Sequence, residues 1–78
     1  MHKLVPLTSL RNGEKGIVNM IDGGQGVMQR LQAMGVREGK EVKKISGMFL
    51  FGPVTVQVGQ TRIAIGHGMA SKIMVAKK

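Results

Sequence analysis

The stretch RLQAMGVREGKEV, residues 30–42, decides how this sequence folds, because it changes from a helical pattern to an extended one. Leu31 and Met34 continue an apolar series that begins with Val27 and Met28, and these side chains share one face of a helix. The opposite face points outward and carries Gln29, Arg30, Gln32 and Ala33. The segment therefore predicts one short amphipathic helix in which Leu31 and Met34 are structural.

Gly35 is expected to end this helix, since a glycine in the left-handed conformation is the usual stop after the last apolar residue. Val36 can then fold back onto the helix as the accompanying apolar contact. Gly39 turns the chain into the next extended segment. A helix of about two and a half turns is only marginally stable alone, so it must pack against other elements.

Five segments have the composition and alternation of β-strands. They cover residues 16–21, 39–46, 53–58, 61–65 and 73–75. In the third segment Val54, Val56 and Val58 alternate with polar residues, and Gly59-Gln60 behind it is a two-residue hairpin signal. These five strands are the main part of the predicted fold.

Two of the strands make more specific predictions. Val42 and Ile45 are both apolar but an odd number of residues apart, which indicates a bulge or a strong twist. In the strand over residues 61–65, Thr61, Ile63 and Ile65 are expected to point inward, because they alternate with Arg62 and Ala64.

The remaining segments are expected to connect these elements. Residues 4–10 form an apolar lead-in or a single helical turn, and GHGMASK, residues 66–72, forms a turn or one short helical turn. DGGQG, residues 22–26, reads as a mobile connector, because it lacks the lysine of a Walker-type phosphate loop. Five short strands with one small helix predict a mainly β fold, a partly open β-barrel that spans residues 1–78 as one domain.

The composition limits the classes of function. The 78 residues include no cysteine and carry a formal net charge of +8, from 12 Lys and Arg against 4 Asp and Glu. This charge attracts nucleic acid, anionic lipid or an acidic protein surface, and it equally suits a solvated basic surface. Base stacking needs aromatic side chains, and only Phe49 and Phe51 are present, so nucleic-acid binding is not expected. No apolar run could span a bilayer, which favours a cytoplasmic protein.

The titratable residues do not form a recognisable catalytic or metal site. His67 and Ser71 are one helical turn apart, but no orienting acid or oxyanion motif accompanies them. Neither His2 nor His67 has a second ligand at helical spacing. We therefore expect no enzyme activity, no cofactor and no metal ligand.

The order of these features resembles the FeoA family, the small SH3-like cytoplasmic component of bacterial ferrous iron uptake. The similar segments cover nearly the whole chain, and they are PLTSLRNGEKGIV, DGG, LQAMGVREGKEV, GPVTVQVGQTRIAI and the closing IMV. The resemblance implies an SH3-like barrel, and it implies the membrane GTPase-transporter FeoB as partner. The same domain also ends the iron-dependent repressors, but no winged-helix segment precedes it here, so the transport component is expected.

Two surfaces are candidates for contact with a partner. Four consecutive apolar residues stand between two expected strands, where a tight turn is normally polar; they are Met48, Phe49, Leu50 and Phe51. This tip either forms an interface or folds over one end of the barrel and seals it. The second candidate is the outer helix face with Gln29, Arg30 and Ala33, for which simple solvation is the alternative.

The sequence therefore predicts an accessory protein of ferrous iron uptake that acts without catalysis. Binding to the cytoplasmic domain of FeoB, or self-association into a homo-oligomer, is the expected mode of action. Contact with the membrane is expected to be peripheral at most, at its anionic inner face. The alternative is a basic SH3-like module for nucleic-acid binding or regulation.

Overall fold

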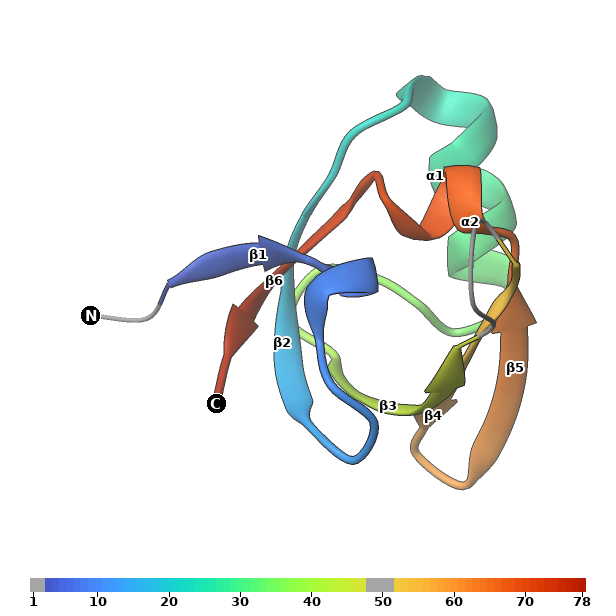
Figure 1. Ribbon diagram of the computed structural model, residues 1–78. Coiled ribbons are helices and arrows are strands. Elements are labelled where there is room, and N and C mark those ends of the chain that lie inside the picture. Colours follow the sequence, from blue (N-terminus) through green and yellow to red (C-terminus); the bar gives the residue numbers. More distant parts are fainter. Residues whose placement is uncertain (1–2, 48–51) are drawn as a thin grey trace.

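Six β-strands form one antiparallel sheet in the computed structural model, which describes residues 3–47 and 52–78. In chain order they are β1 (Leu4–Pro6), β2 (Lys15–Ile21), β3 (Glu41–Gly47), β4 (Val54–Val58), β5 (Thr61–Ile65) and β6 (Ile73–Lys77). Their spatial order is β1-β6-β2-β3-β4-β5. The sheet curls around the core with β1 and β5 as its two edges (Figure 1), so the predicted partly open barrel is confirmed.

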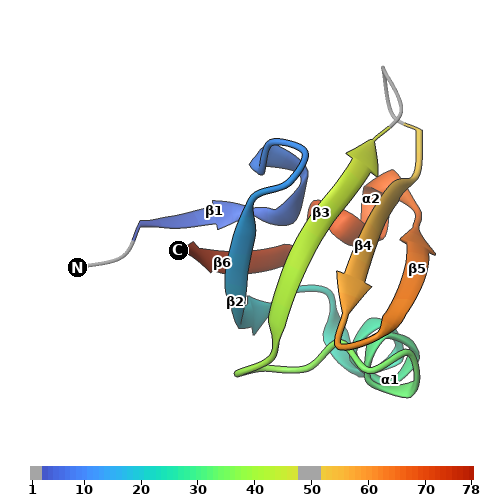
Figure 2. The same ribbon diagram turned by 90° about the horizontal axis from the view of Figure 1, so that it is seen from below.

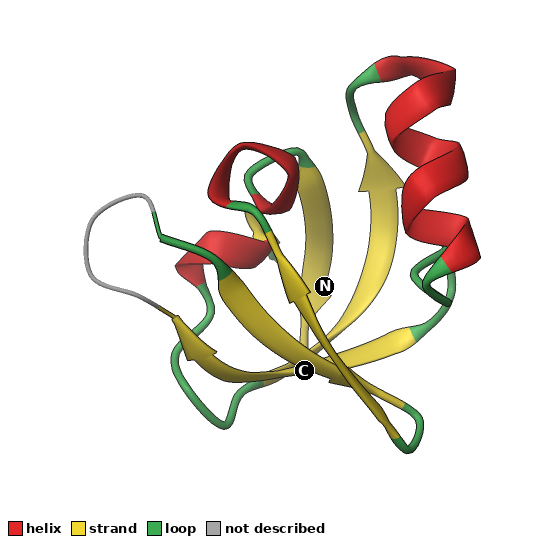
Figure 3. Ribbon diagram, turned by 90° about the vertical axis from the view of Figure 1, so that its right-hand side faces the viewer, coloured by secondary structure: helices red, strands yellow, loops and turns green. Residues whose placement is uncertain are grey.

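The helices lie at the open parts of this barrel. They are α1 (Gly24–Ala33), the short α2 (His67–Ala70) and the 3-10 turn η1 (Leu7–Ser9). Figure 2 shows α1 beside the turn between β4 and β5, and Figure 3 shows it along one side of the sheet. The helical turn predicted within residues 66–72 is confirmed as α2.

The end of α1 has the predicted geometry. Gly35 has φ of 90°, in the left-handed region that favours glycine, and Gly39 has φ of 88°. The N–H of Gly35 donates to the carbonyl of Gln32 at 2.9 Å, and the N–H of Val36 donates to the carbonyl of Leu31 at 2.8 Å. These two bonds form a Schellman motif, which satisfies carbonyls that the helix itself leaves unpaired.

The core lies inside the curled sheet and is wholly apolar among the described residues. Leu31 and Val36 are fully buried in it, and Met34 is half-buried against it. Val54, Val56 and Val58 are buried, which confirms the alternation of β4. The two strands β4 and β5 are joined by the predicted two-residue turn, since Val58 pairs with Thr61.

The bulge predicted from Val42 and Ile45 is confirmed. The register between β3 and β4 shifts between Lys44 and Ser46, so Ile45 is the additional residue. A second shift, between β2 and β6, leaves Asn19 between the paired residues Val18 and Met20. Bulges of this kind bend a strand and help a short sheet to curl.

Two predictions are wrong in detail. Residues 4–10 were expected to form an irregular lead-in or a single helical turn, and η1 confirms the turn. The sixth strand, β1, in the same segment was missed, because only its pairing with β6 makes it a strand. The helix begins at Gly24, inside the stretch expected to be a connector, since Val27 and Met28 pack on the core and hold the first turn in place. A third prediction, the inward side for Thr61, is confirmed by its pairing with the buried Val58, although its side chain is exposed because it directly follows the turn.

Candidate functional site

The outer face of α1 is solvent-exposed, as the sequence predicts. Gln29, Arg30, Gln32 and Ala33 are exposed, whereas Leu31 between them is fully buried. The buried leucine fixes the helix on the barrel, so the exposed side chains are presented on a rigid element. Such a surface can dock a partner without first being ordered.

A shallow hollow of about 260 Å³ follows this helix. It is lined by Gln25, Met28, Gln29 and Gln32. These positions form one stripe along the helix, in which the half-buried Met28 adds an apolar surface to amides that both donate and accept hydrogen bonds. Of the helix residues predicted as contacts, Gln29 lines this hollow, while Arg30 and Ala33 do not.

The other predicted contact, the tip formed by Met48, Phe49, Leu50 and Phe51, lies outside the described residues. A different apolar surface, which the sequence reasoning missed, is exposed elsewhere. Leu4 and Met20 are large hydrophobic side chains with 44% and 49% of their surface exposed.

Strand pairing gathers more apolar residues around these two. Leu4 pairs with Ala76 and Met20 pairs with Met74, and residues paired directly across antiparallel strands point to the same side. The outer side of β1, β6 and β2 is therefore one surface, here called the apolar face, formed by Leu4, Pro6, Ile17, Met20, Met74 and Ala76. The apolar residues of β2 and β6 were visible in the sequence, but the strand β1 was not.

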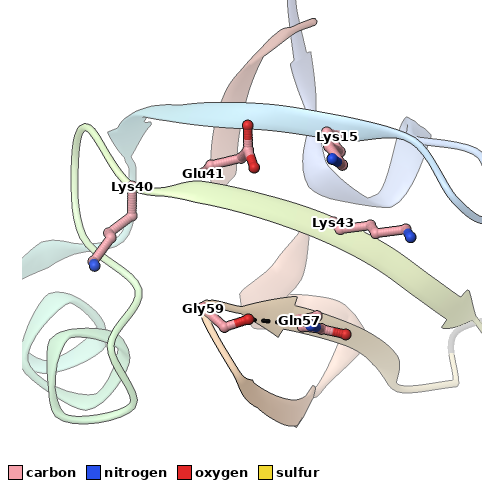
Figure 4. Close-up of a pocket in the computed structure, with 6 residues that line it drawn as sticks. All are labelled: Lys15, Lys40, Glu41, Lys43, Gln57 and Gly59. Atoms are coloured by element: carbon pink, nitrogen blue, oxygen red, sulfur yellow. Dashed lines mark hydrogen bonds between the residues drawn. The ribbon is translucent and has the colours of Figure 1, made fainter.

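A second, larger hollow of about 360 Å³ lies on β2, β3 and β4 (Figure 4). It is called the basic hollow here, and it is lined by Lys15, Lys40, Glu41, Lys43, Gln57 and Gly59. Lys43 on β3 pairs with Lys15 on β2 and with Gln57 on β4, so adjacent strands bring these side chains together. The sequence reasoning missed this site, because Lys15 and Gln57 come beside Lys43 only through strand pairing.

Two carboxylates are held by the last two lysines of the chain. Lys78 Nζ donates a hydrogen bond to Glu41, which lowers the pKa of that carboxyl group, and the positive charge of Lys15 lowers it further. Glu14 accepts a hydrogen bond of 2.6 Å from the backbone N–H of Arg11, which is the main reason that its pKa is lowered. Lys77 Nζ lies 3.3 Å from Glu14 and acts in the same direction. Both carboxylates are therefore ionised at neutral pH.

Lys44 has a structural role, in contrast to its neighbour Lys43. Its Nζ donates to the carbonyl of Leu10 at 2.7 Å and to the carbonyl of Thr8 at 3.3 Å. These bonds tie β3 to η1 and the residue after it. These two adjacent lysines therefore have different surroundings, with Lys43 in the basic hollow and Lys44 bound to the backbone.

One residue considered for chemistry, Ser71, forms a local hydrogen bond. The hydroxyl of Ser71 donates to the carbonyl of Gly68 at 2.8 Å, within its own turn. In the part of the chain that the structure describes, no group of three or more His, Cys, Asp or Glu side chains could hold a metal ion. Within residues 3–47 and 52–78, no helix is both long and apolar enough to cross a membrane.

The model of the FeoA domain family matches residues 5–77. The chain belongs to the FeoA family. It is 44% identical over 72 residues to a protein of Methanocaldococcus jannaschii whose name refers to Fe(2+) transport, and the match covers 92% of this chain and 85% of the relative.

Solved structures agree with the family and the fold. This FeoA-family chain matches a crystal structure described as an iron uptake regulatory protein (FeoA), with a TM-score of 0.88 and 39% identity over 97% of this chain and 99% of that one. A manganese-dependent transcriptional repressor matches with a TM-score of 0.89. That match has 18% identity and covers all of this chain but 44% of the repressor, so it shows a shared fold alone.

Proposed function

We propose that this chain is a non-catalytic accessory protein of ferrous iron uptake that binds the cytoplasmic part of the membrane GTPase-transporter FeoB. The observation that carries the proposal is the FeoA family match over residues 5–77, supported by the relative whose name refers to Fe(2+) transport. Such a protein works in the cytoplasm. Its net charge of +8 suits a position beside the anionic inner face of the membrane.

The action follows from binding alone. A bound domain shifts the conformational equilibrium of its partner only by as much as it binds one state more tightly than the other. The accessory protein therefore needs a rigid contact surface and no catalytic group.

The outer face of α1 is the contact that we propose first. It is exposed on a helix that Leu31 anchors in the core, and Arg30 suits a mildly acidic partner surface. The hollow beside Met28 can receive an apolar side chain of the partner. The apolar face and the tip at residues 48–51 are the further proposed contacts, for FeoB or for a second copy of the chain.

Co-purification with a FeoB cytoplasmic domain tests this proposal, carried out with and without guanine nucleotide. Ala33→Arg places a bulky charge on the outer face of α1, while arginine keeps a high helix propensity. The matched control is Ala64→Arg, the same change at an exposed position of β5. We expect Ala33→Arg to weaken binding and Ala64→Arg to bind as the wild type does. If the wild-type chain does not bind with or without nucleotide, FeoB is not its partner.

Self-association is tested on the same material by analytical ultracentrifugation. Met20→Gln removes an apolar side chain from the apolar face at nearly constant size, and Phe49→Ser with Phe51→Ser does so at the tip. A change in oligomeric state with either variant, at an unchanged melting temperature, assigns that surface to self-association. A melting temperature that falls with the double serine variant assigns the tip to the core.

The second candidate function, a nucleic-acid-binding or regulatory module, is favoured by the net charge of +8. Phosphate contacts release counterions, so the affinity for nucleic acid falls as salt is added. A plot of log affinity against log salt concentration has a slope of about −0.9 for each phosphate contacted. We expect no tight binding of generic DNA at physiological salt. Tight binding there would replace the transport proposal.

A further inference from the structure

The basic hollow has no role in the proposed function, and it differs from the other surfaces in charge. Three of its six lining residues are lysines and one is a glutamate, whose charge Lys78 already offsets. We propose that the basic hollow is a binding site for a ligand that carries two or more phosphate groups. This inference stands independently of the interaction with FeoB.

The sheet register builds this site. Neighbouring strands lie about 4.8 Å apart, so Lys15, Lys43 and Gln57 form a row across β2, β3 and β4. Lys40 comes from the turn that precedes β3, and Figure 4 shows Lys40 and Lys43 on opposite sides of the hollow. A volume of about 360 Å³ is within the usual range for small-molecule sites.

The row places two like charges side by side. Lysines directly opposite each other on paired strands repel and destabilise a sheet, and Lys15 and Lys43 are such a pair. Within the described residues, the ammonium groups of Lys40 and Lys43 form no hydrogen bond or ion pair, whereas Lys44, Lys77 and Lys78 have partners. A bound anion would relieve this repulsion.

The side chains of the hollow favour phosphate over anions that carry large apolar groups. Neither an aromatic nor a large aliphatic side chain is among the lining residues, so the site recognises charge rather than a base or an acyl chain. Lysine binds phosphate as a compact charge with several donors. Three lysines against one glutamate that Lys78 already offsets give the hollow enough positive charge for more than one phosphate group.

The polar groups between the lysines are compatible with an anion. The side-chain amide of Gln57 donates to the carbonyl of Gly59 at 3.1 Å. This bond occupies the carbonyl oxygen of Gly59, an acceptor that would otherwise face the anion. Arg62 Nε donates to the amide oxygen of Gln57 at 3.3 Å. Glu41 is the remaining negative group, and its position predicts that it weakens anion binding while Lys78 limits that effect.

Titration calorimetry with inorganic pyrophosphate, at low and at physiological salt, tests the proposal. The variants are Lys15→Gln, Lys40→Gln and Lys43→Gln in the hollow. Lys72→Gln, in the turn after α2, is the control that removes the same charge elsewhere. We expect each hollow variant to weaken binding about threefold or more and the control to change it less than twofold. Glu41→Gln should strengthen binding, since it removes the negative charge and frees Lys78.

A second probe identifies the source of the phosphates. Vesicles of phosphatidylcholine with cardiolipin, an anionic lipid whose headgroup carries two phosphates, are compared with vesicles of phosphatidylcholine alone. Binding to pyrophosphate or to the anionic vesicles with this pattern of variants supports the site, and the probe that binds more tightly names the source. The proposal is overturned if neither binds at low salt, if Lys72→Gln weakens binding as much as the hollow variants, or if Glu41→Gln does not strengthen it. Duplex DNA that binds more tightly than both probes also overturns it.

Discussion

The backbone N–H of Val36 donates a 2.8 Å hydrogen bond to the carbonyl of Leu31, and both side chains are fully buried. This bond reverses the chain over Gly35 and places both residues in the core. The same contact turns the outer face of α1 to solvent, so the surface proposed to bind a partner depends on the packing beneath it.

Leu31→Asp is expected to unfold the domain or to make it aggregate. The change puts a charge without a partner into the apolar core, and a core of this size has little stability to lose. Gln29→Asp is the control, because it introduces the same side chain at an exposed position of the same helix. Circular dichroism with thermal melting distinguishes the two. An unchanged cooperative melt of Leu31→Asp would show that this residue does not face the core.

Gly35→Val should lower the free energy of unfolding by at least about 1 kcal/mol, because a β-branched residue is forced into the left-handed conformation.

Gly26→Ala should act in the opposite direction. Gly26 is in the first turn of α1, and an added Cβ there meets no atom within 4 Å. We expect a gain of about 0.5 kcal/mol, since alanine has less conformational entropy to lose. Urea denaturation measures both, and no gain for Gly26→Ala would indicate that the helix begins later.

Lys44→Met should cost about 1–2 kcal/mol of stability, because the carbonyl of Leu10 loses its charged donor in a partly buried position. Methionine keeps the aliphatic part of the side chain and removes the ammonium group. Lys40→Met is the control, since Lys40 is exposed and its ammonium forms no such bond in the described part of the chain. Equal urea midpoints for the two variants would argue against the tie between β3 and η1.

Acid should weaken the fold through Glu14 and Glu41. Both carboxyl groups have a pKa lowered from the ordinary value of 4.5, Glu14 mainly by the N–H of Arg11 and Glu41 mainly by Lys78. A lowered pKa stabilises the folded state above pH 4.5, and this contribution is lost as the pH falls through the lowered values. The variant with Glu14→Gln and Glu41→Gln should therefore lose less stability than the wild type when melts at pH 7 and pH 3 are compared. An equal loss in both proteins would contradict this assignment.

Lys43→Gln is expected to raise the free energy of unfolding by about 0.2–1 kcal/mol, since it removes the like-charge pair with Lys15. The same change should weaken anion binding, so stability and binding move in opposite directions. Melting at low salt detects the gain, which high salt should reduce by screening. A loss of stability would show that Lys43 is part of the structural framework.

Much of the fold could be predicted because its signals are local. Three of these signals depend only on residues a few positions apart in the sequence. They are the helix face with Leu31 and Met34, the stop at Gly35 and the alternation of Val54, Val56 and Val58. The bulge at Ile45 was visible as a break in the same alternation. The outward orientation of the helix residues proposed as contacts followed from the helix period.

The missed features depend on partners distant in the sequence. β1 is a strand because Val5 pairs with Val75, and three residues carry too little pattern to reveal it. The apolar face required the same pairing, since Leu4 meets β6 only in the folded sheet. The basic hollow required the register that sets Lys15 beside Lys43.

The sequence by itself determined the family, the mainly β class and the way in which residues 30–42 end a helix and return to the sheet, because helix periodicity and the conformational freedom of glycine act over a few residues. Only the tertiary structure decided the roles of Lys43 and Lys44. Both have the same charge and adjacent positions, but one lines a solvent-exposed hollow and the other binds the carbonyl of Leu10. The physical reason is that successive side chains of a strand point to opposite sides, and what each side meets is set by strands from elsewhere in the chain.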